Sequence, residues 1–259
     1  MGSRKIIRMN VTESTNSVAL DAGELGAPPG TVVLADSQTG GRGRLNRRWL
    51  SPPGMGLYFS LVLRPVLAAE DLPKITLAAG LAVSKAVEDE YDVSLQIKWP
   101  NDLLLGGRKF GGILTETGSM QKMSPGQYPL VVVGVGLNLF PPHGGFPSEL
   151  KERATSLSLH VDRKIASEIL LEACAKAIEE MLQRLETGDF PAILSEWMQR
   201  DATKDKVLTW ITPQGKEVTG VSLGPGADGV LHIRDLAGTI HTVLSGDVNL
   251  VGKIPERHP

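Results

Sequence analysis

The sequence KWPNDLLLGGRKFGGILTE, residues 98–116, decides the class of fold. An extended run at 95–98 leads into it, and two further runs, at 103–105 and 111–115, are separated by a turn at Gly106 and Gly107. Another extended run occupies 130–139. Short runs that alternate with turns predict the strands of a sheet with mixed or antiparallel pairing.

The rest of the chain supplies further strands and helices. We predict strands at 6–9, 31–35 and 57–63, and helices at 12–25, 72–91, 165–185 and 190–198. Short strands at 218–223, 230–233, 239–244 and 248–251 predict a small β-barrel. The predicted class is therefore α+β, with a mixed β-sheet packed on helices in residues 1–203 and a small C-terminal domain in residues 204–259.

The composition is that of a soluble globular protein, with 41% hydrophobic and 22% charged residues among 259. No apolar run reaches the roughly 18–20 residues of a membrane span, and the first ten residues do not form a signal-peptide pattern. We therefore expect a cytoplasmic protein without a membrane partner. A net charge of −2 gives no general attraction to nucleic acid, so any anion site must be local.

The single cysteine, Cys174, excludes an internal disulfide and a multi-cysteine metal site. Its helical spacing places it on a predicted buried face, together with Ile165, Ile169, Ala173, Ala177, Met181 and Leu185. We therefore assign it to the core rather than to catalysis.

The stretch QTGGRGRLNRRW, residues 38–49, is too rich in glycine and arginine to be regular structure. Its glycines allow the backbone to approach a ligand closely, and Arg42 and Arg44 carry guanidinium groups suited to carboxylate and phosphate. This pattern predicts an anion-binding loop. The alternative is a solvated basic loop or a patch that touches RNA.

Two other segments carry polar groups at the ends of predicted strands. Asn101 and Asp102 project from a turn after Pro100, and Lys109 follows the next turn. Glycines at 111 and 112 inside a strand mark the close approach of a ligand or of another backbone. A plain turn and a surface lysine are the alternative for this segment. In VVVGVGLNL, residues 131–139, Asn138 needs partners, which a ligand or the neighbouring backbone could supply.

Taken together, these segments resemble a known family. The motifs ESTN (13–16), QTGGRGR (38–44) with Arg48 and Trp49, KWPND (98–102), RKFGGIL (108–114) and GVGLN (134–138) occur in the order seen in biotin–protein ligases. The resemblance also covers ATSL (154–157) and the C-terminal strands. It implies a sheet-and-helix core similar to those of class II aminoacyl-tRNA synthetases, with an SH3-like C-terminal domain.

The resemblance also implies the site residues. Those implied to bind biotin are Ser14, Thr15, Asn16, Gln38, Gly41, Arg42, Gly43, Arg44, Lys109, Gly111 and Gly112. Those implied on the nucleotide side are Arg44, Trp49, Asn101 and Asn138, with Asp102 near magnesium and the phosphates. Lys109, Arg44 and Asp102 are the implied catalytic residues.

The implied reaction activates biotin with ATP and Mg²⁺ as biotinyl-5′-AMP and then transfers biotin to a lysine of a biotin carboxyl carrier protein. Such a reaction needs no nucleophile from the enzyme, in keeping with the lack of a Ser/His/Asp or Cys/His arrangement. About ten residues precede ESTN, so we expect no DNA-binding domain before it and no DNA partner. A homodimer is left open. The rival hypotheses are a lipoate or octanoate ligase of similar fold and a non-enzymatic nucleic-acid-binding module.

Overall fold

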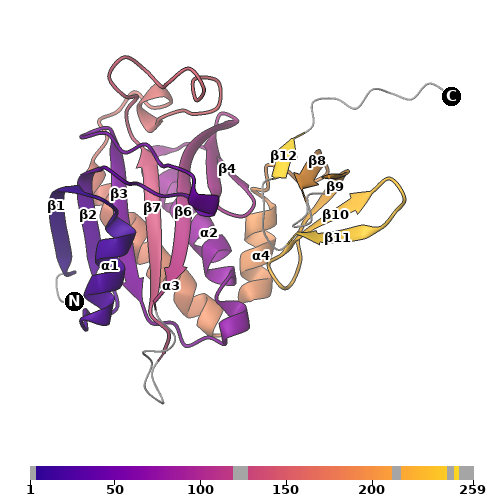
Figure 1. The fold of residues 1–259 in the computed structure, drawn as a ribbon, viewed down its shortest axis with the longest axis horizontal. Coiled ribbons are helices and arrows are strands. Elements are labelled where there is room, and N and C mark those ends of the chain that lie inside the picture. Colours follow the sequence, from indigo (N-terminus) through magenta and orange to yellow (C-terminus); the bar gives the residue numbers. More distant parts are fainter. Residues whose placement is uncertain (1–3, 119–127, 212–216, 244–247, 251–259) are drawn as a thin grey trace.

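The computed structural model describes residues 4–118, 128–211, 217–243 and 248–250. Its largest element is a seven-stranded sheet with the order β1-β2-β3-β7-β6-β5-β4 (Figure 1). The strands are β1 (Ile6–Thr12), β2 (Val32–Gln38), β3 (Gly56–Leu63), β4 (Leu95–Lys98), β5 (Asp102–Leu105), β6 (Arg108–Thr117) and β7 (Val131–Asn138). β1 and β2 are parallel, and the other neighbours are antiparallel, which confirms the prediction of a mixed sheet.

Helices cover both faces of this sheet. They are α1 (Thr15–Glu24), α2 (Lys74–Tyr91), α3 (Ser167–Glu186) and α4 (Phe190–Met198), as predicted to within a few residues. Because side chains alternate along a strand, Phe59 and Val133 face the core formed with α2 and α3, whereas Val62 and Val132 pack with Ala19 of α1. The helix α1 therefore lies on the face opposite to α2 and α3 (Figure 1).

The buried face of α3 differs in part from the prediction. The buried residues are Leu170, Leu171, Cys174, Ala175, Ile178, Met181 and Leu185. Ile169 is 58% exposed, so its assignment to the buried face is wrong, and Ile165 precedes the helix, which begins at Ser167. Cys174 is buried as predicted, and burial raises the pKa of its thiol to about 12. At neutral pH it is a thiol in the core.

The C-terminal strands form a second sheet with the order β11-β10-β9-β8-β12, in which all pairs are antiparallel. Its strands are β8 (Val207–Ile211), β9 (Glu217–Pro225), β10 (Leu231–Asp235), β11 (Ile240–Val243) and β12 (Val248–Leu250). The pairings among described residues leave this sheet open rather than closed as a barrel. Residues 244 and 251 of the predicted strands lie outside the described part of the chain.

The second sheet shares a core with the first. Leu208 and Ile233 belong to the same buried cluster as Trp197 of α4 and the residues of α2. The boundary between residues 203 and 204 stays a prediction, because one buried cluster includes residues from both sides of it. In the described residues no helix combines the length and apolarity required to cross a membrane.

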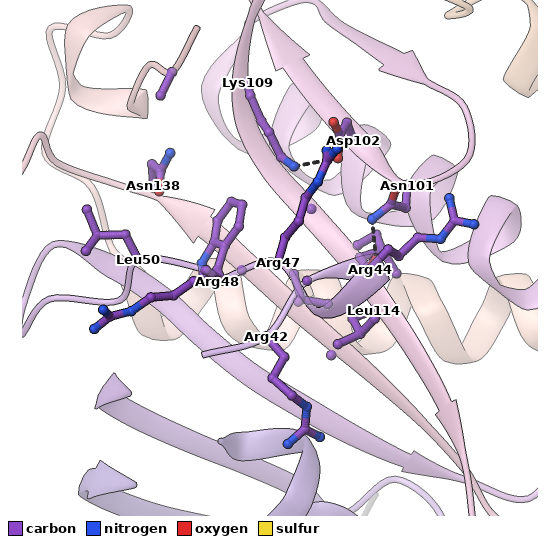
Figure 2. A pocket seen from close by; sticks show the side chains of 18 of the residues that line it. Arg42, Arg44, Arg47, Arg48, Leu50, Asn101, Asp102, Lys109, Leu114 and Asn138 are labelled. Carbon is purple, nitrogen blue, oxygen red and sulfur yellow. Dashed lines mark hydrogen bonds and ion pairs between the residues drawn. The ribbon is translucent and has the colours of Figure 1, made fainter. Parts of the chain in front are cut away.

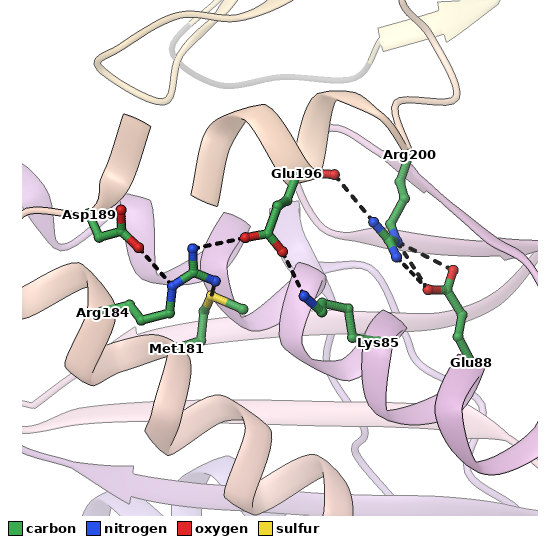
Figure 3. A network of polar contacts seen from close by, with 7 residues as sticks. All are labelled: Lys85, Glu88, Met181, Arg184, Asp189, Glu196 and Arg200. Atoms are coloured by element: carbon green, nitrogen blue, oxygen red, sulfur yellow. Dashed lines mark hydrogen bonds and ion pairs between the residues drawn. The ribbon is translucent and has the colours of Figure 1, made fainter. Parts of the chain in front are cut away.

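A polar network fixes α4 to the helices beside it (Figure 3). Glu196 of α4 accepts hydrogen bonds from Lys85 of α2 (2.6 Å) and from Arg184 of α3 (2.8 Å). The least exposed pair joins Arg200, just after α4, to Glu88 of α2 at 2.6 Å. These contacts hold the segment that leads into the second sheet against α2.

We expect Glu88→Ala to destabilise the fold by about 1–3 kcal/mol. The substitution leaves the guanidinium of Arg200 without its carboxylate and removes the acceptor, 3.0 Å away, of the Leu95 amide. Urea unfolding measures the loss. Glu180→Ala is the control, since its ion pair with Lys176 is 3.6 Å long and exposed, and equal losses in both variants would refute the expectation.

Candidate functional site

A cavity of about 690 Å³ lies on the α1 side of the large sheet (Figure 2). It is bounded by the first residues of α1, by the loop after β2, and by alternate residues of β6 and β7. Its volume is in the range of sites for small molecules, which run from roughly 300 to 1,000 Å³.

Glycines make the floor of the cavity. Gly136 of β7 pairs with Gly112 of β6 on one side and with Tyr58 of β3 on the other. The indole of Trp49 covers this row, because a Cβ atom on Gly136 would lie 2.6 Å from Trp49 Nε1. A neighbouring glycine, Gly134, likewise leaves room for the side chain of Asn16. The GxG pattern of β7 thus clears space on one face of the sheet.

The wall of the cavity is strongly basic although the chain carries a net charge of −2. The charged residues that line it are seven basic ones (Arg42, Arg44, Arg47, Arg48, Lys98, Lys109 and Arg153) and two acidic ones (Asp102 and Glu152). Burial, the larger cause, lowers the pKa of Arg44 and of Lys98, and Asp102 opposes both shifts. Neighbouring cations lower the pKa of Lys98 further. A bound anion would relieve this repulsion.

Lys109 lines the cavity, as the functional interpretation of this lysine requires. Its Nζ lies 2.6 Å from Asp102 Oδ1 and 5.3 Å from the centre of the Trp49 ring. Asp102 begins β5 and Lys109 follows the turn to β6, so the hairpin brings them together. The guanidinium carbon of Arg44 lies 5.8 Å from the centre of the Trp99 ring. Arg44 makes no ion pair with a residue that the structure describes.

Residues 153–155 form a strap beside Lys109. The Lys109 amide donates to the Arg153 carbonyl at 2.7 Å, and the Thr155 amide donates to the Lys109 carbonyl at 2.9 Å. The Thr155 carbonyl accepts from Asn138 Nδ2 at 3.0 Å, which confirms the neighbouring backbone as a partner of this side chain. The strap therefore fixes Lys109 and Asn138 relative to each other.

The other end of the cavity is formed by the start of α1. Ser14, Thr15 and Asn16 are each at most 4% exposed. The Thr15 amide donates to Gln38 Oε1 at 2.8 Å, and Gln38 Nε2 donates to Ser51 Oγ at 2.9 Å. These contacts make a polar, nearly dry wall of fixed donors and acceptors, which suits a small uncharged polar ring.

Most of the residues predicted for the site line one cavity. These are Ser14, Thr15, Asn16, Gln38, Arg42, Gly43, Arg44, Trp49, Asn101, Asp102, Lys109, Gly112 and Asn138. Gly41 and Gly111 do not line it. A Cβ atom on Gly41 would meet the Trp49 carbonyl at 2.5 Å, and one on Gly111 would meet Leu137 at 2.5 Å, so both glycines serve close packing.

Sequence reasoning gave no role to Lys98, Arg153 or Glu116. Lys98 and Arg153 line the cavity, and Glu116 forms an ion pair with Arg42 at 2.9 Å. Glu116 follows Gly112 and Leu114 at a spacing of two, which places it on the face of β6 that carries the cavity. That periodicity was the available signal for Glu116.

Comparisons with known proteins give one consistent result. The model of the biotin/lipoate A/B protein ligase family matches residues 9–138. A bifunctional ligase/repressor BirA from Bacillus subtilis is 34% identical over 95% of this chain and 74% of its own length. A biotin–[acetyl-CoA-carboxylase] ligase from Mycobacterium tuberculosis is 33% identical over 95% of this chain and 89% of its own. The structure of an Aquifex aeolicus biotin protein ligase with biotin and ATP has a TM-score of 0.81 and 29% identity, and covers 97% of this chain and 100% of that one.

We expect Gly136→Ala to displace Trp49 from the cavity floor. The new methyl group would overlap the indole, whereas a methyl group on Gly112 would meet nothing closer than 3.7 Å. Gly112→Ala is therefore the matched control. Intrinsic tryptophan fluorescence, with a Trp49→Phe variant to identify the signal, measures the displacement. A Trp49 spectrum unchanged in Gly136→Ala would contradict the expectation.

Proposed function

The chain belongs to the biotin/lipoate A/B protein ligase family, and on this premise we propose that it joins biotin to ATP as biotinyl-5′-AMP and transfers biotin to a protein lysine. The observation that carries the proposal is the basic cavity beside a dry polar wall. The wall suits a ureido ring, and the cations suit a carboxylate and a triphosphate. Relatives named as biotin–[acetyl-CoA-carboxylase] ligases support a biotin carboxyl carrier protein as the acceptor.

In the first step a carboxylate oxygen of biotin attacks the α-phosphorus of ATP, and the bond to pyrophosphate breaks. Two anions must approach each other, and charge builds further on the phosphoryl oxygens, so cations fixed beforehand supply the main stabilisation. We assign this role to Lys109 and Arg44. Lys98 lies in the same cationic cluster, near Asp102 and Lys109.

In the second step the neutral amine of the acceptor lysine attacks the acyl carbonyl, and AMP leaves. The acceptor supplies the nucleophile and loses a proton, so the chain needs only to orient the adenylate and exclude water. The buried Cys174 takes no part.

We propose that biotin's ureido ring lies against Ser14, Thr15, Asn16 and Gln38, and its carboxylate near Arg44, Lys109 and Gly112. Trp49, Asn101 and Asn138 are proposed for the nucleotide. Magnesium fits the chemistry of Asp102, because Mg²⁺ is commonly held by one or two carboxylates together with substrate phosphates. A bound magnesium ion would neutralise charge on the phosphates. Asp102 would hold the ion and would also remain paired with Lys109.

The macromolecular partner that we propose is the carrier domain. The net charge of −2 disfavours DNA as a partner. A homodimer stays open, and a cytoplasmic location stays a prediction. Among acyl substrates we place biotin before lipoate or octanoate, because the wall at the start of α1 is made of buried polar side chains, which suit a polar ring better than an aliphatic chain.

We expect the purified protein to release pyrophosphate from ATP only when biotin is present, because the biotin carboxylate is the attacking group. A coupled pyrophosphate assay with biotin, lipoate and octanoate in parallel tests this. Release that lipoate or octanoate supports and biotin does not would overturn the proposed function.

Lys109→Met should lower the rate constant for adenylate formation about a hundredfold, as expected for loss of a group that stabilises transition-state charge. The methionine keeps most of the packing against Trp49 but lacks the ammonium. Single-turnover kinetics measure the step, and Lys151→Met, at an exposed position outside the cavity, is the control. Equal rate constants in the two variants would place Lys109 outside the chemistry.

A further inference from the structure

Glu116 joins three parts of the site that are far apart in the sequence. It lies on β6, and its carboxylate accepts from Arg42 Nη2 at 2.9 and 3.1 Å. It also accepts from Asn16 Nδ2, in α1, at 2.6 Å. The second terminal nitrogen of Arg42 donates to Ser17 Oγ, also in α1, at 2.8 Å. The anion-binding loop is thus fastened at its first arginine to both the helix and the sheet.

The same carboxylate also helps to set the direction of the hydrogen bonds behind the cavity wall. Asn16 Nδ2 donates to Glu116 at 2.6 Å and to the Leu114 carbonyl at 3.1 Å. Both groups only accept, so the Asn16 amide must turn its NH₂ group to them and its oxygen to Ser60. Ser60 Oγ lies 2.6 Å from Asn16 Oδ1 and 2.8 Å from Thr15 Oγ1. Its single proton goes to the amide oxygen, which cannot donate in return. The single proton of Thr15 Oγ1 can then go either to Ser60 Oγ or to Gln38 Oε1, which lies 3.2 Å away.

The arginines of the loop are therefore not equivalent. Arg42 has partners at both terminal nitrogens, and Figure 2 shows its guanidinium turned away from Lys109 and Asp102. Arg44 lies on the other side, over Trp99, without an ion pair to any described residue. Of the first two arginines of the loop, Arg42 is thus already held by the protein, and Arg44 remains available to a substrate anion.

We propose that Glu116 is a positioning residue for biotin: it anchors the loop through Arg42, it orients the Asn16 amide together with the Leu114 carbonyl, and it leaves Arg44 to meet the substrate anion. This inference rests on the proposed function. Glu116 does not touch the reacting atoms. Its side chain and that of Arg42 are 30% and 35% exposed, so the pair contributes little to folding and acts chiefly through geometry.

Glu116→Gln tests the proposal with almost no change in shape. Glutamine offers one acceptor oxygen in place of two, and its NH₂ group cannot accept from Arg42 or Asn16. We expect the KM for biotin to rise about tenfold or more, with the KM for ATP and the melting temperature nearly unchanged. Glu168→Gln is the control, because it weakens an ion pair with Arg8 that is 2.7 Å long, against 2.9 Å for Glu116 and Arg42, and that lies away from the cavity.

A purely structural role for Glu116 would change both KM values together or lower the melting temperature. Either result, or a KM for biotin within about twofold of the wild type, would overturn the proposal. Arg42→Met adds a double-mutant cycle. If the two residues act as one anchor, the double variant should bind biotin no more weakly than the weaker single variant, and additive losses would count against the anchor.

A second measurement does not require turnover and so separates this proposal from the proposed function. Trypsin cleaves after the arginines of the loop, and loss of the anchor should speed cleavage at Arg44, Arg47 and Arg48 about threefold or more. If the wild type does not use biotin, the proposed function is wrong. The cleavage rates would still show whether Glu116 anchors the loop. Unchanged cleavage in Glu116→Gln would show that Glu116 does not hold the loop.

Discussion

The steric constraint on which the site depends is the absence of side chains from alternate positions on one face of the large sheet. Gly134 and Gly136 on β7 leave room for Asn16 and Trp49. The residues between them, such as Val135, fill the opposite face against α2 and α3. One strand thus supplies both core and cavity floor, because its side chains alternate while its backbone hydrogen bonds remain intact.

Four of the seven basic residues that line the cavity form two groups that differ in their electrostatic surroundings. Arg42 and Lys109 each have an acidic partner, Glu116 and Asp102, at hydrogen-bond distance. Arg44 and Lys98 are instead half-buried, and burial lowers the pKa of both. Paired cations keep their positions without ligand, and the desolvated ones gain most from a substrate anion. A cavity of this kind is preorganised for anions although the chain is net acidic.

The sequence allowed prediction of the mixed sheet and the four helices, because hydrophobic periodicity is a local property. The resemblance to a known family, and not periodicity, supplied the predicted residues that line the cavity. Side-chain contacts between segments far apart in the chain could not be predicted from the sequence. Arg42 and Glu116 are 74 residues apart, and nothing in either motif indicates that they meet. The face of α3 was misjudged at Ile169 because two adjacent apolar stripes compete in that helix and only packing decides between them.

The strap at residues 153–155 reduces the conformational entropy that the chain must lose when it binds a substrate. Since it engages both the amide and the carbonyl of Lys109, the main chain of this lysine is already ordered before any substrate arrives. Only its side-chain rotamers remain to be restricted, a loss limited to about 2 kcal/mol for a lysine. Because the same strap holds the amide of Asn138, that residue is also immobilised during folding. The ordering of two segments from adjacent strands, β6 and β7, is therefore completed once, when the chain folds, and not in each catalytic cycle.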